Sequence, residues 1–242
     1  MSSMALRTLA ILSMLSDHLG FALYGALPEP VCVGMRLAGR LAMPIFCFLI
    51  AEGLFHTRSV SRYAGRLLLF GVISEIPFDL CFSRGAAAFN WGEQNVFFTL
   101  FLGLLAIYLC DRFALRGQYG LSLLAVLLCA FLAELIRADY GMFGVLFIFV
   151  FYIFRASPKA RMWVFAAVCL LLGLYYWFTP PAPFDPPKDP VWAVTLCCAA
   201  FAALPVWLYN GKKGRGGRAA QIAFYAFYPV HLLLIALFAY NR

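Results

Sequence analysis

Residues 33–55 read VGMRLAGRLAMPIFCFLIAEGLF, a stretch that is apolar and long enough to cross a lipid bilayer as a helix but that contains two arginines. Arg36 and Arg40 are four residues apart, so they share one face of the expected helix. A charged side chain at the centre of a bilayer costs about 2.5–3.5 kcal/mol on insertion scales. We therefore expect both arginines to be buried against other polar groups, in a polar site within the membrane.

The adjacent apolar spans supply those polar groups. Asp17 and His18 lie in the span before residues 33–55, and Glu75 and Asp79 lie in the span after it. With a helical rise of about 1.5 Å per residue, the four side chains and the two arginines reach similar depths in the outer half of the membrane. The sequence therefore predicts that all six residues form one network.

The composition places the rest of the chain in the membrane as well. Of 242 residues, 64% are hydrophobic and 12% are charged, a balance that water-soluble domains of this length do not normally show. About nine windows, with a range of roughly eight to ten, are long enough to cross a bilayer, and they are continuously apolar rather than alternating, which excludes a β-barrel. The windows are residues 5–27, 33–55, 63–82, 95–110, 119–136, 140–154, 162–178, 191–209 and 219–240. The prediction is an all-α polytopic membrane protein with one domain, residues 1–242.

The basic residues give the orientation of this bundle, because cytoplasmic loops carry an excess of lysine and arginine. With a cytoplasmic N-terminus, the outer side holds only Arg84, Arg137, Lys188 and Arg242. The inner side then holds Arg7, Arg58, Arg62, Arg66, Arg112, Arg116, Arg155, Lys159, Arg161, Lys212, Lys213, Arg215 and Arg218. The net charge of +8 is therefore explained by topology, and residues 211–218 are expected to face anionic lipid rather than nucleic acid.

The eight cysteines lie mostly inside the apolar windows and show neither a CxxC pair nor zinc-like spacing. We interpret them as small packing residues, and no metal site is expected. Residues 180–190 (PPAPFDPPKDP) are expected to form a stiff outer linker.

His18 is the residue whose role is hardest to explain by packing. Neighbouring residues on a helix point about 100° apart, so Asp17 is not expected to orient His18. The expected partner comes from another helix, with Glu75 as the first choice and Asp79 as the second. The alternative is a neutralised ion-pair network that only ties helices together. That alternative explains the charges less well, because apolar packing would cost less, and it leaves His18 without a role.

Other polar residues are weaker candidates. Glu52 and His56, four residues apart near the inner end of the second span, are either an interfacial pair or contacts for a donor substrate. His231, in the last span, is either a packing residue or an alternative catalytic group. Three further candidates at the outer ends of later helices are Asn95, Glu134 and Asp139.

Six segments, in this order, resemble the TraX family of bacterial membrane proteins. They are residues 13–21 (SMLSDHLGF), 35–57 (MRLAGRLAMPIFCFLIAEGLFHT), 62–80 (RYAGRLLLFGVISEIPFDL), 95–103 (NVFFTLFLG), 133–141 (AELIRADYG) and 227–233 (FYPVHLL). The family is named for a plasmid-encoded inner-membrane protein that acetylates the N-terminus of pilin. The resemblance implies an acetyl-CoA-dependent acetyltransferase in the bacterial cytoplasmic membrane, with pilin or another envelope molecule as acceptor. The arrangement of Arg7, His18, Arg36 and Arg40 also resembles the wider membrane acyltransferase superfamily.

The chemistry of acetyl transfer suits the same residues. A histidine titrates near neutral pH, so His18 is the candidate general base for an amine acceptor. An arginine near the thioester can stabilise the oxyanion, and Glu75 or Asp79 can set the histidine tautomer. Direct transfer and an acetyl-histidine intermediate are both open. Arg36 and Arg40 are expected at the acceptor or oxyanion end, because they lie in the outer half of the membrane.

Acetyl-CoA is made in the cytosol, so its anionic nucleotide should meet the inner loops. The candidate donor-binding residues are Arg7, Glu52, His56, Arg58 and Arg62. Two other functions fit the same intramembrane charges. A transporter or proton-coupled carrier would use them as a relay or substrate site, although no inverted repeat is evident. A structural membrane subunit would need none of them for activity.

Overall fold

The computed structural model describes residues 1–85, 89–90, 92–178, 194, 196–214 and 217–240. These residues form helices joined by loops, and their only β pairing is two isolated bridges. In chain order the helices are α1 (Ser3–Ala22), α2 (Glu29–Gly39), α3 (Ala42–His56), α4 (Val60–Phe82), α5 (Val96–Ala114), α6 (Tyr119–Leu135), α7 (Gly141–Ile153), α8 (Pro158–Phe178), the 3-10 helix η1 (Ala199–Ala202), α10 (Ala203–Trp207) and α11 (Arg218–Tyr240). The predicted all-α fold is confirmed. The predicted linker at residues 180–190 lies outside the described residues.

Within the described residues, four helical segments are long and apolar enough to cross a membrane. They are Glu29–His56, Val96–Ala114, Pro158–Phe178 and Ala219–Phe238. Helices α1 and α4 contain 20 and 23 residues, which is also a spanning length, but their charged residues lower their hydropathy. Together with the composition, these helices make the chain a multi-pass membrane protein.

The span predicted at residues 33–55 differs in detail from the structure. The window at residues 33–55 is not one continuous helix, because α2 ends at Gly39 and α3 begins at Ala42. Pro44 lies in the first turn of α3 and has no N–H to continue the hydrogen bonding of α2, whereas a proline is well accommodated at the start of a helix. Arg40 therefore lies at the C-cap of α2, in the turn between the two helices.

The chain forms two compact units, each built from two separate segments. The first unit contains Met1–Ile45 and Phe154–Gly214, and the second contains Phe46–Ile153 and Arg215–Arg242. In the first unit, α1 and α2 form a helical hairpin, and α8 packs against η1 and α10. The side-chain hydroxyl of Ser2 caps α1 by accepting a hydrogen bond from the Ala5 amide.

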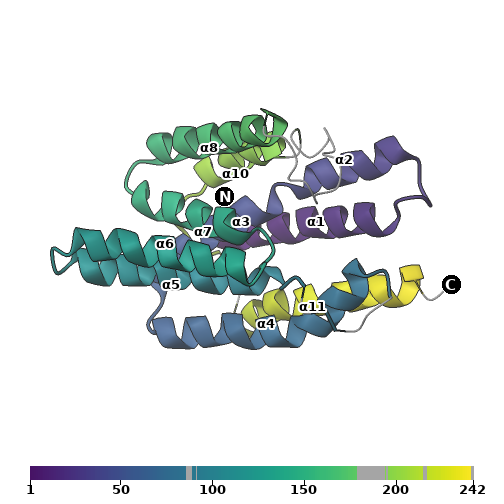
Figure 1. Cartoon of the computed structure of the whole chain (residues 1–242), viewed down its shortest axis with the longest axis horizontal. Helices are drawn as coiled ribbons and strands as arrows, with labels where there is room; N and C mark the ends of the chain where they lie inside the picture. Colours follow the sequence, from purple (N-terminus) through teal and green to yellow (C-terminus); the bar gives the residue numbers. More distant parts are fainter. Residues whose placement is uncertain (86–88, 91, 179–193, 195, 215–216, 241–242) are drawn as a thin grey trace. The chain divides into compact units, whose positions relative to one another are not determined.

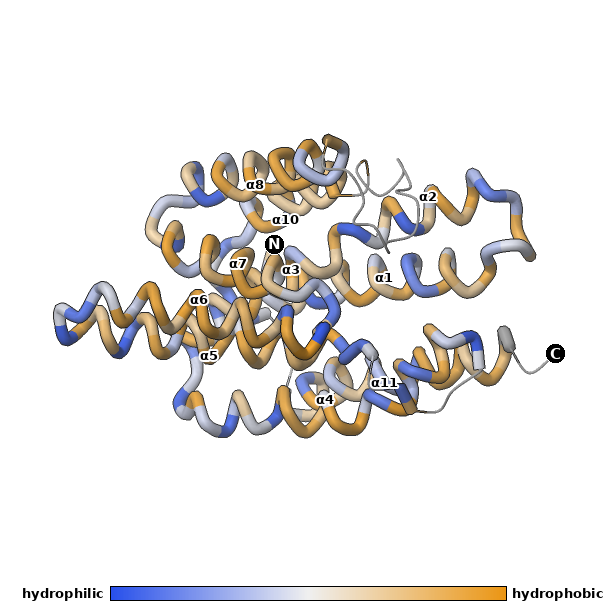
Figure 2. The backbone as a smooth tube through the Cα atoms, viewed as in Figure 1, coloured by the Kyte–Doolittle hydropathy of each residue, from blue (hydrophilic) through white to orange (hydrophobic). Residues whose placement is uncertain are grey.

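In the second unit, α5, α6 and α7 pack against one another, and α4 packs against both α5 and α11 (Figure 1). The core between α5, α6 and α7 consists of small and medium apolar side chains, which allow close approach of the helices. These are Leu102, Ala106, Cys110, Val126, Cys129, Ala130, Ala133 and Val145. Figure 2 shows that the three helices are hydrophobic along most of their length, with hydrophilic residues gathered in the loop between α5 and α6.

Lys212 and Lys213 lie beside the start of α1, in the first unit. The Ser3 amide donates a hydrogen bond of 2.9 Å to the Lys212 carbonyl, and the Met4 amide donates one of 3.1 Å to the Lys213 carbonyl. Both segments are predicted on the cytoplasmic side of the membrane. Their pairing places them on one side, in agreement with an even number of crossings between them.

Candidate functional site

Asp17 of α1 forms ion pairs with both arginines at the end of α2. The Nε of Arg36 lies 3.6 Å from Asp17 Oδ1, and Nη2 of Arg40 donates a hydrogen bond to Asp17 Oδ2. The Nε of Arg40 also donates to the Arg36 carbonyl over 3.3 Å. The prediction that Asp17 meets the two arginines is confirmed, whereas their catalytic roles stay a prediction.

Glycines allow α1 and α2 to approach closely enough for these contacts. A Cβ atom added to Gly39 would overlap the side chain of Asp17. A Cβ added to Gly20 would lie 2.9 Å from both the Cys32 carbonyl and the Met35 Cβ, which is closer than real Cβ atoms come. The two glycines therefore let the backbones pack together, as small residues do between membrane helices.

Serines of α1 also join the two helices. The Ser13 hydroxyl donates to the Ala38 carbonyl, and the Ser16 hydroxyl donates to the Met35 carbonyl over 3.0 Å. The last carbonyls of a helix have no partner within it, and that of Ala38 is one of them, so the Ser13 bond satisfies a group that would be costly to leave bare in a membrane. The hairpin holds Asp17 in a fixed position.

A glycine substitution tests whether this close packing positions Asp17. Gly39→Ala should destabilise the protein by about 1–3 kcal/mol, because the added methyl group must displace the Asp17 side chain. Gly34→Ala, on the same helix, meets no atom within 4 Å and serves as the matched control, neutral or slightly stabilising. Thermal unfolding of the purified variants in detergent compares them. Equal melting temperatures would contradict the proposed packing.

The two arginines differ in accessibility. The Arg40 side chain is 7% exposed and the Arg36 side chain is 25% exposed. The Arg36 guanidinium also lies over the Phe21 ring, 5.6 Å from its centroid. Arg40 is thus held within the hairpin, whereas Arg36 is the one that a substrate could reach. His18, next to Asp17, is buried.

The second unit contains a separate polar cluster, formed by Glu75, Asp79, Asn95, Asp139 and Tyr228. Asn95 is fully buried, and both its amide, at 3.0 Å, and its Nδ2 donate to Oε1 of Glu75. The same Nδ2 donates to the Gly71 carbonyl over 2.7 Å. The Oδ1 of Asn95 caps α5 by accepting from the Phe97 amide over 3.0 Å. Asn95 thereby fixes the Glu75 carboxylate of α4 at the N-terminus of α5.

The other members of this cluster also contact backbone groups. Asp79 accepts a hydrogen bond of 2.7 Å from the Asn90 amide. The Asp139 amide donates to the Gln94 carbonyl over 2.7 Å. Tyr228 of α11 is buried, and its ring meets the Phe97 ring of α5 with centroids 5.2 Å apart. Sequence reasoning did not identify Tyr228, although it lies three residues before His231 in a segment that carries the family resemblance.

The predicted network of six residues is thus seen as two groups, one in each unit. Asp17, Arg36 and Arg40, with the adjacent His18, lie in the first unit, whereas Glu75 and Asp79 lie in the second. The pairing of His18 with one of these carboxylates stays a prediction.

His231 makes contacts within its own helix. Its Nδ1 lies 2.7 Å from the Phe227 carbonyl, and its ring stacks on the Phe227 ring with centroids 4.7 Å apart. The edge of its ring also meets Tyr228, at 5.7 Å between centroids. These are the contacts expected of the packing alternative.

The remaining candidates occupy element ends. Glu134 accepts a hydrogen bond of 3.2 Å from the Met142 amide, which links the end of α6 to the start of α7. Glu52 and His56 form the expected pair, with 3.5 Å between Oε2 and Nε2. Arg58 and Arg62 are exposed in the second unit, and Arg7 is half-buried on α1 in the first.

Over the described ranges, no three histidine, cysteine, aspartate or glutamate side chains come together as a metal site requires.

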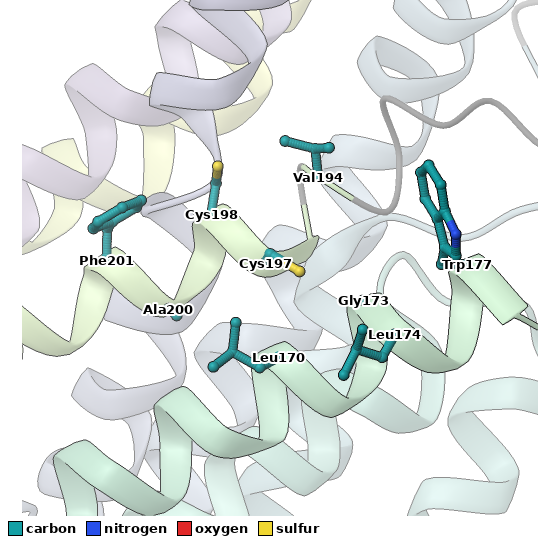
Figure 3. Close-up of a pocket in the computed structure, with 9 residues that line it drawn as sticks. All are labelled: Leu170, Gly173, Leu174, Trp177, Val194, Cys197, Cys198, Ala200 and Phe201. Atoms are coloured by element: carbon teal, nitrogen blue, oxygen red, sulfur yellow. The ribbon is translucent and has the colours of Figure 1, made fainter.

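An apolar pocket of about 440 Å³ lies in the first unit, between α8 and a facing segment that contains residues 194 and 197–201. Figure 3 shows its lining, to which α8 contributes Leu170, Gly173, Leu174 and Trp177. The facing segment contributes Val194, Cys197, Cys198, Ala200 and Phe201. The pocket contains none of the candidate site residues and suits an apolar group rather than an ionic reaction.

Comparisons with known proteins agree with the segments that the sequence shares with one family. The family model described as TraX protein matches residues 2–239. The probable fimbrial assembly protein FimC, serogroup H1, of Dichelobacter nodosus is 34% identical over 181 residues, which are 71% of this chain and 70% of that protein. An uncharacterized protein of Rickettsia prowazekii (strain Madrid E) is 28% identical over 137 residues, 56% of this chain and 49% of that protein. No solved structure matches. The chain belongs to the TraX family.

Proposed function

We propose that this protein is an acetyl-CoA-dependent acetyltransferase of the bacterial cytoplasmic membrane. Its acceptor is an amine or hydroxyl group of an envelope molecule, and the N-terminus of a pilin subunit is the first candidate. Membership of the TraX family and similarity to a probable fimbrial assembly protein support a pilus-related role. The observation that carries the proposal is the ion-paired group of Asp17, Arg36 and the buried Arg40 beside the buried His18 in an apolar helical hairpin.

In the proposed reaction, the nitrogen of the acceptor amine attacks the thioester carbonyl, and His18 takes a proton from that nitrogen. The new carbon–nitrogen bond forms, the carbon–sulfur bond breaks, and His18 returns the proton to the departing thiolate. Arg36 stabilises the oxyanion, because it is the more accessible of the two guanidinium groups. Arg40 acts as a positioning residue, since it holds the Asp17 carboxylate and the Arg36 backbone.

The pairing of His18 with Glu75 or Asp79 stays a prediction, because the histidine and the two carboxylates lie in different units. Both carboxylates are buried, and the hydrogen bonds from Asn95 and Asn90 fix them in position. A carboxylate held by backbone amides is preorganised to accept a further hydrogen bond from an imidazole or an ammonium group.

Acetyl-CoA fits the charge distribution of the described residues. Arg58 and Arg62 are exposed at the start of α4, and Arg7 lies near the start of α1, where the orientation predicts the cytoplasm. The cations of either unit suit the phosphates of the donor. A thioester at the end of the flexible pantetheine arm can then enter the membrane region.

The experiment that tests this function uses purified protein, radiolabelled acetyl-CoA and separated envelope fractions. The expected result is label in one protein or glycan that depends on the added enzyme, and mass spectrometry then identifies the modified amine or hydroxyl. Label that appears equally without the protein would reject the proposal.

A transporter is the second candidate, and one observation favours it. Glu75, Asp79 and Tyr228 are buried polar groups within apolar helices of the second unit, as in a relay for protons or a substrate. Proteoliposomes distinguish the two functions. A transporter moves its substrate or protons across the membrane without CoA, whereas the proposed enzyme requires acetyl-CoA and modifies an acceptor.

A further inference from the structure

Residues 210–214, which lie between α10 and α11, are fixed against the beginning of α1. Besides the bonds that Ser3 and Met4 donate to Lys212 and Lys213, the Asn210 amide donates to the Met1 carbonyl over 2.9 Å. The Asn210 side chain accepts a hydrogen bond of 3.1 Å from the Lys212 amide. We call residues 210–214 the basic loop. Its backbone is attached at several points, so its two lysines have a defined place beside α1.

Glycines make this attachment possible. Gly211 and Gly214 adopt positive φ angles of 73° and 80°, which disfavour other residues. A Cβ on Gly214 would also lie 2.6 Å from the Ser2 hydroxyl oxygen and 3.0 Å from the Met4 Cβ. The backbone of the basic loop can therefore follow this path only because Gly211 and Gly214 have no side chains.

The basic loop gives this end of the first unit a positive potential. Lys212 and Lys213 are exposed, and Arg7 lies one turn beyond Ser3 and Met4 on the same face of α1. No acidic residue occurs in the first turn of α1. The loop carbonyls occupy the Ser3 and Met4 amides, so the cationic side chains, rather than the helix end, are the groups that can bind an anion.

We propose that the basic loop and Arg7 bind the phosphate groups of CoA. This inference rests on the proposed function, and it identifies the donor site with two lysines that the sequence suggested only as lipid contacts. Attraction to anionic lipid needs charge but no fixed backbone, because headgroups surround a polybasic segment from many directions. A pyrophosphate and a ribose phosphate have a defined spacing, and a backbone held by glycines and hydrogen bonds matches that requirement.

Two variants separate the contribution of the loop's backbone conformation to CoA binding from the contribution of its charge. Lys212→Ala with Lys213→Ala removes the cations, which are exposed, so the fold should be kept. Gly214→Ala keeps every charge but forces the loop away from Ser2 and Met4. Gly217→Ala is the matched control, because a Cβ there meets no atom within 4 Å and the backbone φ is ordinary.

The experiment measures the dissociation constant of CoA, and of CoA lacking its 3′-phosphate, for the full chain in nanodiscs of neutral lipid. The double lysine variant and Gly214→Ala should each bind CoA about tenfold or more weakly, as expected for the loss of one or two charged hydrogen bonds, and Gly217→Ala should bind as the wild type does. Binding of each variant to vesicles containing anionic lipid is measured in parallel.

The outcomes distinguish this site from the proposed function. CoA affinity that is unchanged in the double lysine variant overturns the site and leaves acetyl transfer untouched. If Gly214→Ala folds and keeps CoA affinity while the lysine variant loses only anionic-vesicle binding, the loop is a lipid contact and the inference fails. If CoA binding depends on the loop but no acetyl is transferred, the site stands and the proposed function fails. A wild type that does not bind CoA overturns both.

Discussion

His18→Ala should lower the rate of acetyl transfer about 10²–10⁴-fold, the range typical for loss of a general base. CoA affinity should stay within about twofold, because the basic loop and Arg7 are unchanged. The substitution should lower kcat rather than weaken binding. His18 is buried beside the ion-paired Asp17, so the variant must be shown to insert and to melt as the wild type does. Single-turnover transfer and CoA titration give the two quantities.

His231→Asn is the control for this prediction. Its ring contacts Phe227 and Tyr228 of its own helix, so transfer should stay within about tenfold, or about 1.4 kcal/mol of barrier. Loss of transfer with His231→Asn alone would move the active site to α11. If His18→Ala transfers acetyl at the same rate as the wild type, His18 is not the general base.

Arg40→Met should lower the free energy of unfolding by about 3–5 kcal/mol, because it leaves the Asp17 carboxylate without its buried partner. Arg36→Met makes the same chemical change at the more exposed position, where the ion pair measures 3.6 Å, and should cost about 1 kcal/mol or less. Chemical unfolding in detergent compares the two variants.

Activity should show the opposite order for these two arginines. Arg36→Met is expected to reduce transfer by about 10²–10³-fold in a protein that remains folded, as for loss of an oxyanion donor. Arg40→Lys should restore part of the stability by keeping a cation near Asp17. Equal destabilisation by Arg40→Met and Arg36→Met would show that the exposure of each arginine does not set its role.

The sequence predicted the group of Asp17, Arg36 and Arg40 because depth in a membrane follows from residue number. Counting along two apolar spans brought Asp17 to the level of Arg36 and Arg40, and the ion pairs follow. The same counting did not reveal the turn at Arg40, since the effect of Pro44 depends on whether it lies inside a helix or at the start of one.

The polar cluster of the second unit depends on tertiary contacts, which residue spacing does not reveal. Asn95 was identified only as a polar residue at a helix end, whereas it caps α5 and holds the Glu75 carboxylate of another helix. In the sequence, nothing distinguishes Tyr228 from other aromatic residues of apolar spans. Its position becomes evident only from the packing of α11 against α4. Rotation about a helix axis and packing between helices decide such contacts, and a single sequence specifies neither directly.

The most direct test of the proposed function is acetyl transfer in proteoliposomes that contain this chain as their only protein, together with the acceptor identified from envelope fractions. Radiolabelled acetyl-CoA is supplied on the face of the membrane that bears the basic loop, which is the predicted cytoplasmic face. We predict that label passes to the acceptor with the wild type and falls to the uncatalysed rate with His18→Ala. Absence of label with the folded wild type, or equal label with His18→Ala, would contradict the account.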